Sequence, residues 1–536
     1  MDKKGIQKDE RSKLTMDNLE AGYGVVGEDS EDALFHKAFD ENVQVDADDE
    51  LIQEDTPSTM DRNAVFQFSF RRLLVFLGPG FLMSIAYLDP GNLESDIQAG
   101  STAGYSLLWL LLLSTILGLI LQTRTVNLGV VTGKHLAEHC RHEFPRYIRV
   151  PLWAMTEVAI IGSDIQEVLG SAIAINLLSN GAVPLWAGTL ITAADTFTFL
   201  FLQNYGIRRL EAFFAFLISI MSITFGVQYF THLPPQFDVF KGTVVPQISS
   251  GTIQQAVGTI GAVIMPHNLY LHSALVLSRR LDRSNNARIK EGIVYNTIES
   301  ALALAISYFI NMFVVCNFAY MDYSKCGDVG DIGVASAGTC MEKNYGTYML
   351  YIWAVGLLAS GQSSTCTGTY AGQFVMEGFL SIKVVMWKRL LITRLTAIGP
   401  AVIVALITSN SKQIDTVQQW LNVLQSVQLP FAILPVIYFT NSRKTMGERW
   451  ANSRTMTVVM WLITALVVTA NIYLVITFVQ TNITGSPLVY TILSLMALLY
   501  LGLNFYLLLG CFGVLDPVAE KFAQIFGSSQ GYKTVQ

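Results

Sequence analysis

The chain has 536 residues, of which 51% are hydrophobic and only 14% are charged, with a formal net charge of −6 at pH 7. A soluble core of this size cannot bury so much apolar side chain, so the composition excludes a soluble globular protein and predicts an all-α polytopic membrane protein. The charge pattern gives no indication of nucleic-acid binding, and six cysteines are too few for a disulfide scaffold.

The acidic residues concentrate at the start of the chain. Residues 1–61 contain 18 of the 41 acidic residues but only 6 of the 35 basic ones, with few aromatic residues among them. This composition is typical of a disordered tail. We expect an acidic cytosolic tail over residues 1–65, a transmembrane domain over residues 66–515 and a second cytosolic tail over residues 516–536. No apolar run stands at the start, so no cleaved signal peptide is expected.

Twelve apolar segments are long enough to cross a bilayer, and turn residues or basic pairs such as Arg208-Arg209 separate them. The segments lie at about 73–93, 106–131, 150–180, 184–203, 210–231, 254–279, 293–321, 347–380, 387–409, 417–440, 455–479 and 488–513.

The connecting loops alternate in charge. One alternating set holds most of the loop Lys and Arg residues. The positive-inside rule therefore makes that set, and both termini, cytosolic. A glycosylation sequon at Asn482 follows the eleventh segment and falls on the predicted outer side. The basic residues of the opposite set are only Lys241, Lys325, Lys343 and Lys412.

The first segment contains the sequence Asp89-Pro90-Gly91-Asn92. In water this is a turn sequence, because Pro fixes φ and Gly accepts positive φ. In hydrocarbon a turn leaves backbone groups without partners, so a break is tolerated only where it faces protein or a wet cavity. The alternative is a loop just outside a short helix.

The sixth segment contains Met265-Pro266-His267-Asn268, which shares the pattern X-Pro-X-Asn with the first. The two segments cross in opposite senses, so segments 1–5 and 6–10 form a five-plus-five inverted repeat. Interrupted helices at matching positions of two halves indicate the substrate site of a transporter. The repeats span about 73–231 and 254–440, and the two additional helices, at about 455–513, are expected to be peripheral.

The two breaks offer a mixed set of metal donors. The carbonyl four residues before each break proline loses its helical partner, because proline has no N–H. Carboxylate and carbonyl oxygens suit a divalent cation, whereas a thioether does little for Mg²⁺ or Ca²⁺ and favours Mn²⁺ or Fe²⁺. Alternatively, the methionine fills a gap in an apolar core. The candidate donors are the carboxylate of Asp89, the amide of Asn92, the thioether of Met265 and the carbonyl of Ala86, Ala262 or both.

Four of the further ionisable residues inside apolar segments are candidates for moving protons. Asp164 and Glu167 are three residues apart and so share one helix face, where two buried carboxylates favour proton exchange. His267 and His272 follow the second break, and histidine titrates near physiological pH. These residues predict a proton route beside the metal, although either histidine is equally explained as a hydrogen-bonded packing residue.

Three other residues have more local interpretations. The tenth segment is rich in amides, and Asn422 either lines the cavity or forms interhelical hydrogen bonds. Cys326 and Cys340 share one hydrophilic loop, and an extracytosolic loop would allow a disulfide between them.

The break motifs, together with the stretches 162–167 and 361–365, resemble the natural resistance-associated macrophage protein (Nramp) family, and in particular its animal divalent metal transporter branch. The resemblance runs from Gly78-Pro79-Gly80 to about residue 513. It implies a LeuT-like fold and proton-coupled import of Mn²⁺ and Fe²⁺ by alternating access, with no resident cofactor, since metal and protons are substrates. Cys366 stands where we expect Met in animal members. The resemblance implies metal ligation by Asp89, Asn92, Met265, Ala86 or Ala262, and Asn422, and proton movement by Asp164, Glu167, His267 and His272.

Two other functions fit the same residues. One is an amino-acid or amine symporter on the same fold, with Asp89 receiving the ammonium group. The other is a sensor that binds metal without moving it. No arrangement of nucleophile and base predicts an enzyme. Tyr23 and Tyr532 begin matches to the tyrosine-based sorting pattern for endocytic adaptors, so either the plasma membrane or an endosomal membrane is expected.

Overall fold

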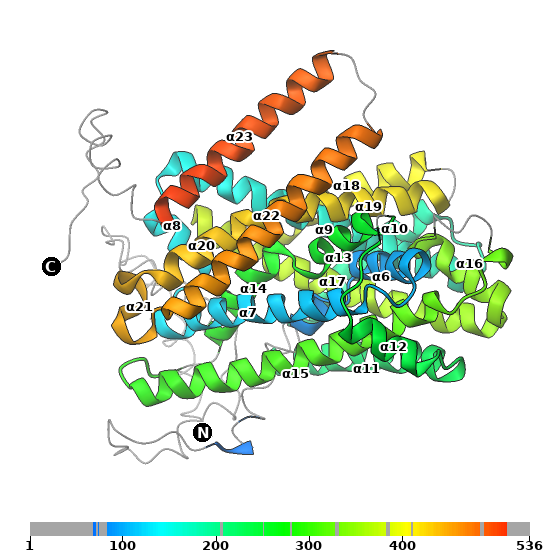
Figure 1. Ribbon diagram of the computed structural model, residues 1–536, viewed down its shortest axis with the longest axis horizontal. Helices are drawn as coiled ribbons and strands as arrows, with labels where there is room; N and C mark the ends of the chain where they lie inside the picture. Colours follow the sequence, from blue (N-terminus) through cyan, green and yellow to red (C-terminus); the bar gives the residue numbers. More distant parts are fainter. Residues whose placement is uncertain are drawn as a thin grey trace, which may run out of the picture.

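The structure of the chain is a computed structural model, and all its described elements are helices (Figure 1). The predicted tails, including Tyr23 and Tyr532, and the Gly78-Pro79-Gly80 stretch lie outside the described residues. The described residues are 68–70, 73, 83–203, 207–249, 251–278, 281–326, 332–381, 386–408, 411–482 and 487–511.

A helix occupies each predicted segment from the second to the twelfth. The helices of the first half are α6 (Pro90–Ala103), α7 (Leu108–Thr132), α8 (Leu136–Glu143), α9 (Arg146–Leu178), α10 (Leu185–Gln203), α11 (Ile207–Thr231) and α12 (Gln236–Val244). Those of the second half are α13 (Ile253–Val263), α14 (Pro266–Leu275), α15 (Asn286–Ala319), α16 (Val334–Tyr345), α17 (Thr347–Leu380), α18 (Met386–Ile407), α19 (Ser411–Gln428) and α20 (Pro430–Asn441). The remaining helices are α21 (Arg443–Trp450), α22 (Arg454–Asn482) and α23 (Pro487–Cys511), with short 3₁₀ turns at Val276–Ser278 and Tyr323–Lys325.

The length and hydropathy of these helices suit a bilayer. Among the described residues, 6 helical stretches are long and apolar enough to cross a membrane, and parts of α10, α11, α18 and α23 add shorter apolar helices. The sixth and tenth predicted segments each comprise two helices, α13 with α14 and α19 with α20, and each second helix begins at a proline.

The first predicted segment ends too early. Its predicted end is near residue 93, but α6 continues to Ala103. The reason is that this half-helix is polar yet buried: Glu94 and Asp96 are at most 1% exposed. Hydropathy alone therefore predicts that this half-helix lies outside the membrane, although its polar groups contact other helices.

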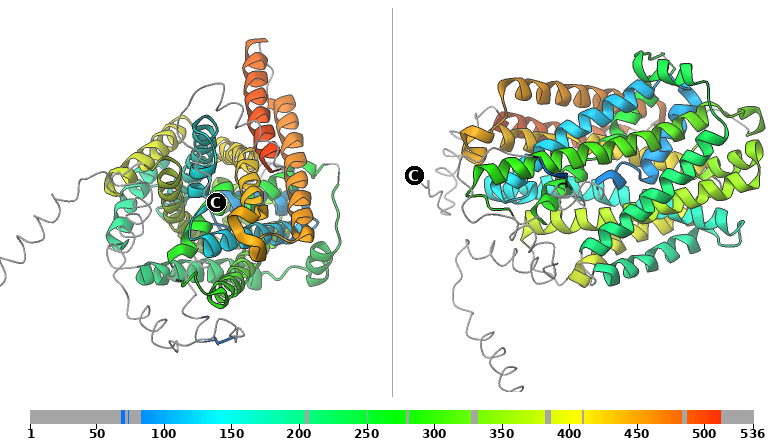
Figure 2. Two further views of the ribbon diagram at one scale, coloured as in Figure 1. Left: turned by 90° about the vertical axis from the view of Figure 1, so that its left-hand side faces the viewer. Right: turned by 90° about the horizontal axis from the view of Figure 1, so that it is seen from below.

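The short half-helices lie inside a frame of long helices. α9 packs along α17, α15 packs on α6 and α7, and α13 contacts both α6 and α19. α22 and α23 pack on α20 and project from one side of the bundle (Figure 2), as expected for peripheral helices. α16 lies at the opposite end of the bundle from α8 and α21 (Figure 1).

Candidate metal site at the two helix breaks

The first break is a true interruption of the chain's helical path. Residues 83–85 are helical, the next residues turn, and α6 begins at Pro90, the first helical position, where a missing N–H is tolerated. Asp89 is the N-cap, with φ −72° and ψ 163°. Its carboxylate accepts hydrogen bonds from the backbone N–H of Gly91 at 3.3 Å and of Asn92 at 3.1 Å, and from the Asn92 side-chain amide.

Side chains of the long helices satisfy the carbonyls that the break exposes. This matters because unpaired backbone groups are costly in a bilayer. Sequence reasoning did not identify the three side chains that donate these hydrogen bonds, Ser307, Asn311 and Ser360. The only available signal was their polar character within apolar segments seven and eight. The carbonyls of Ser84, Tyr87 and Leu88 accept hydrogen bonds from Ser307 of α15 (2.9 Å), Asn311 of α15 (3.0 Å) and Ser360 of α17, respectively.

The second break matches the first. α13 ends at Val263 and α14 begins at Pro266, so Ile264 and Met265 are extended between them. Met265 is the N-cap of α14 and is 2% exposed. The predicted interruptions of helices one and six are therefore both present. Ala262 lies in the last turn of α13 and is buried.

One hydrogen bond joins the two breaks directly. The Nδ2 amide of Asn268 donates to the carbonyl of Ala86 at 3.2 Å. The Ala86 carbonyl, predicted to have lost its helical partner, thus has a side-chain donor from the other half of the protein. Asn268 was not among the predicted site residues, although its match to Asn92 in the X-Pro-X-Asn pattern was the available signal.

A third helix reaches the first break through Asn422 of α19. Its Nδ2 donates to the carbonyl of Gly91 at 3.0 Å, and its Oδ1 accepts from Nε2 of Gln166 at 2.9 Å. Gln166 also donates to the carbonyl of Gln418 at 3.0 Å and accepts from Gln425. The interhelical hydrogen bonds given as one interpretation of Asn422 are therefore present, and one of them reaches the first break. Gln166 was missed, although it lies between the two predicted proton-pathway acids of α9.

The assembled donors are mixed in chemistry and enclosed. Asp89 and Asn92 are each 1% exposed, and Asn422 is 7% exposed. The Oδ1 atoms of Asn92 and Asn268 are buried and accept no hydrogen bond from any described residue. Asp96, one turn after Asn92, also has one such buried carboxylate oxygen. No group of three His, Cys, Asp or Glu side chains that would hold a metal occurs within the described residues. A cation bound here must therefore use amide, carbonyl or thioether donors beside the carboxylate.

The predicted proton residues lie on two different helices. Asp164 and Glu167 of α9 both face α17: a β-carbon built on Gly368 would lie 2.4 Å from Asp164 Oδ1 and 3.2 Å from Glu167 Oε2. His267 and His272 of α14 are buried, and Nε2 of His272 lies 3.4 Å from Ser300 Oγ on α15. The acid pair shares one helix face, whereas His272 contacts a different long helix.

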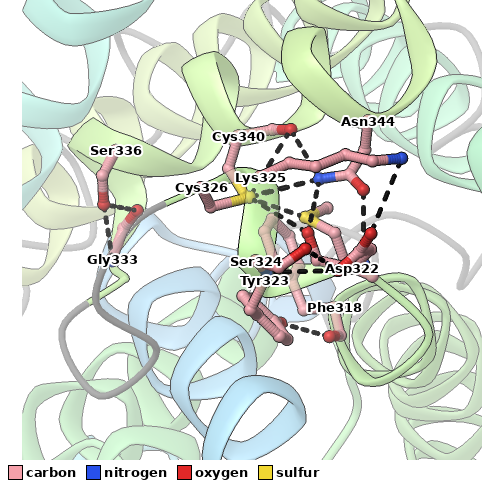
Figure 3. Close-up of a disulfide and its surroundings, with 11 residues drawn as sticks. Phe318, Asp322, Tyr323, Ser324, Lys325, Cys326, Gly333, Ser336, Cys340 and Asn344 are labelled. Atoms are coloured by element: carbon pink, nitrogen blue, oxygen red, sulfur yellow. Dashed lines mark hydrogen bonds and ion pairs between the residues drawn. A yellow bond between two sulfur atoms is a disulfide. The ribbon is translucent and has the colours of Figure 1, made fainter.

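The remaining residues singled out from the sequence are two loop cysteines, the sequon asparagine and Cys366. Cys326 forms a disulfide with Cys340 of α16 (Figure 3). Asn482 is the last residue of α22, and its side chain is outside the described part of the chain. Cys366 is a buried residue of α17.

Residues 80–477 match the family model described as natural resistance-associated macrophage protein-like. The metal transporter nramp1 homolog of Dictyostelium discoideum is 57% identical over 410 residues, covering 76% of each chain. Metal transporter Nramp4 of Arabidopsis thaliana is 51% identical over 441 residues, covering 81% of this chain and 85% of its own. These relatives come from a slime mould and a plant, so they do not support the finer expectation of an animal branch.

Solved structures share the architecture. A variant of the Eremococcus coleocola manganese transporter matches with a TM-score of 0.75 at 30% identity, covering 86% of this chain and 99% of that chain. MHP1, a nucleobase-cation-symport-1 family transporter, matches with a TM-score of 0.50 at 13% identity over 75% of this chain and 91% of its own, which concerns the fold alone. The predicted LeuT-like fold with interrupted first and sixth helices is confirmed.

Proposed function

Because the chain belongs to the natural resistance-associated macrophage protein family, we propose that it is a symporter that moves divalent transition metal ions, Mn²⁺ and Fe²⁺ among them, together with protons into the cytosol. The observation that carries the proposal is the hydrogen bond from Asn268 to the Ala86 carbonyl, because it joins the two breaks. Asp89 and Met265 are the N-caps of the two half-helices that meet there. Relatives named as metal transporters support the class of substrate.

The metal is the substrate, and its ligands come from the breaks. Asp89 supplies charge, Asn92 supplies an oxygen that accepts no described hydrogen bond, and Met265 supplies a soft thioether. Carbonyl oxygen from Ala86 or Ala262 completes the set, with Asn422 from α19. This combination of hard and soft donors favours Mn²⁺ and Fe²⁺ over Mg²⁺ and Ca²⁺.

Protons move beside the metal through Asp164 and Glu167 of α9 and through His267 and His272 of α14. Support for this assignment comes from burial, since all four side chains are at most 3% exposed. Ionisable groups at this depth are expensive and mark ion or proton routes. α14 carries both a metal donor at its N-cap and the two histidines, so its movement would affect both substrates.

Alternating access fits the division between short and long helices. The half-helices bear the donors, while α15 and α17 hold the first break through Ser307, Asn311 and Ser360. Transport requires the site to open toward each side in turn around these donors. The chain acts as a transporter rather than an enzyme and needs no resident cofactor.

Orientation and location complete the proposal. In the proposed orientation both termini are cytosolic, α16 with the disulfide is outside, and Asn482 is available for glycosylation on the outer side. The excess of Lys and Arg in alternate loops supports this orientation. The protein resides in the plasma membrane, an endosomal membrane or both, and its tyrosine motifs at Tyr23 and Tyr532 recruit sorting adaptors.

Uptake of Mn²⁺ into proteoliposomes, with and without an inward acid gradient, tests the function. We expect the gradient to stimulate uptake by the wild-type chain and Asp89→Ala to abolish it. Binding of Mn²⁺ without flux would indicate a sensor instead, and uptake of an organic amine without metal flux would indicate the alternative symporter.

A further inference from the structure

Two carboxylates from different helices meet at the N-terminus of α16. Oε2 of Glu94 accepts a hydrogen bond from the N–H of Val334 at 2.6 Å. Oδ1 of Asp415 accepts from the N–H of Ala335 at 2.8 Å, and its Oδ2 accepts from Ser336 Oγ at 2.8 Å. First-turn N–H groups have no acceptor within their own helix, and this end of a helix favours negative charge. Both carboxylates are buried, at most 1% exposed, so water does not replace these bonds.

The two acids belong to the helices that carry proposed metal donors. Glu94 lies two residues after Asn92 on α6, and Asp415 lies seven residues, about two turns, before Asn422 on α19. Gln98 supports the Glu94 carboxylate by donating to Oε1 at 2.8 Å. α16 therefore connects α6 to α19 at a distance of about half a turn from Asn92 and about two turns from Asn422.

Gly333, the N-cap of α16, leaves space for both carboxylates to reach the N–H groups at the start of α16. A β-carbon there would lie 2.4 Å from both carboxylate oxygens of Glu94 and 2.5 Å from Cγ of Asp415. The backbone of Gly333 has φ −129°, which any residue adopts, so the constraint is space and not conformation. Any side chain at this position would push the carboxylates away from the amides.

The rest of α16 is held by a disulfide, a hydrogen bond and packing against a long helix. Cys340, in the middle of the helix, forms the disulfide with Cys326, and Asn344 donates to the carbonyl of Asp322 at 3.2 Å (Figure 3). α16 also packs against α17 of the long-helix frame. α16 is thus held in place by contacts other than those with α6 and α19.

We propose that Glu94 and Asp415 are positioning residues for transport, which hold α6 and α19 together on the outer side of the metal site by sharing the N-terminus of α16. The two acids release these amides when the outer side opens. Neither acid is a metal ligand in this assignment. The proposal rests on the transport function and orientation proposed above.

Hydrogen exchange of the full-length protein tests the contact without requiring transport. Removing an acceptor with Glu94→Ala or Asp415→Ala should speed exchange in the first turn of α16 by about tenfold. Because α16 links the two helices, Asp415→Ala should also speed exchange in α6, while α9 remains unchanged. Glu94→Gln keeps an acceptor oxygen and should restore most of the protection. Glu342→Gln, on the same helix but bonded to Thr347, is the matched control.

Mn²⁺ uptake distinguishes positioning from ligation. We expect the Vmax of Glu94→Ala and Asp415→Ala to fall by about tenfold with KM for Mn²⁺ within about twofold, because only the rate of opening and closing changes. Gly333→Ala keeps both acids and should produce the same change in Vmax and KM. It therefore still tests the proposal if either acid variant misfolds.

Several results would overturn the proposal. Exchange in α6 that is insensitive to Asp415→Ala would mean that α16 does not couple the helices. A rise in KM without a change in exchange would make the acids ligands. If the wild-type chain carries no Mn²⁺ yet the exchange pattern holds, the metal-transport function fails and the contact between the helices stands.

Discussion

Gly170 of α9 is one of the points at which the first break contacts the long helices, and it offers a sharp test of the site's geometry. A β-carbon built on Gly170 would lie 2.5 Å from Cγ and 2.6 Å from Cβ of Pro90. Non-bonded carbon atoms pack at about 3.5–4.0 Å, so Gly170→Ala requires a shift of about 1 Å between α9 and the start of α6. The proline ring cannot rotate away, since it is closed onto its own backbone. Asp89, the preceding residue, must move with it.

The size of the effect follows from the overlap. Overpacking of this kind costs about 1–3 kcal/mol. If that free energy falls on the metal-bound geometry, KM for Mn²⁺ rises by about 5- to 150-fold, because 1.4 kcal/mol is a factor of ten. Initial rates of Mn²⁺ uptake by proteoliposomes over a range of concentrations measure this KM.

A matched control is present on the same helix. A β-carbon on Gly162 would have its nearest neighbour, Cδ2 of Leu424, at 3.4 Å, which is an ordinary contact. Gly162→Ala should therefore leave KM unchanged, or stabilise α9 slightly through helix propensity. Equal KM values for the two variants would refute the idea that the contact between Gly170 and Pro90 fixes the position of Asp89.

Three further substitutions test individual metal ligands or the residues that form hydrogen bonds with them. Gln166→Ala removes the hydrogen bond that occupies Oδ1 of Asn422, so KM for Mn²⁺ should fall by about fivefold, the equivalent of one hydrogen bond; a rise in KM would contradict this. Asn268→Ala leaves the buried Ala86 carbonyl without its donor and should destabilise the protein by about 1–3 kcal/mol in thermal unfolding, and an unchanged melting temperature would argue against the contact. Met265→Ala should weaken rejection of Ca²⁺ in uptake competition more than it weakens Mn²⁺ uptake, since a thioether discriminates against hard cations; unchanged Ca²⁺ rejection would defeat the assignment.

The helix breaks were predictable because their causes are local. Pro90 and Pro266 each remove a helical hydrogen bond, and the repeated X-Pro-X-Asn pattern marks both sites within a few residues. The same holds for the helices in the second to twelfth predicted segments, where long apolar runs define spanning helices. These features require no knowledge of which residues are neighbours in space.

The partners of the breaks were not predictable, because they depend on packing. Ser307 and Ser360 read as unremarkable polar residues in apolar segments until the structure places them beside the carbonyls of Ser84 and Leu88. Gln166 points to α19 rather than sharing the role of its acidic neighbours. The early end assigned to the first segment has the same origin, since Glu94 reads as solvent-exposed when its buried partner, the N-terminus of α16, lies 240 residues away.

Asp89 combines two roles that a single substitution can separate. Its carboxylate caps α6 through the N–H groups of Gly91 and Asn92, and it also provides the one negative charge among the proposed metal donors. Asparagine caps helices about as well as aspartate but brings no charge. Asp89→Asn should therefore keep the metal-free melting temperature of the wild-type protein and lose Mn²⁺ uptake, whereas Asp89→Ala should lose uptake and also about 1 kcal/mol of stability. If Asp89→Asn retained uptake, a capped break without the carboxylate's charge would suffice for transport, and the proposed ligation by Asp89 would be wrong.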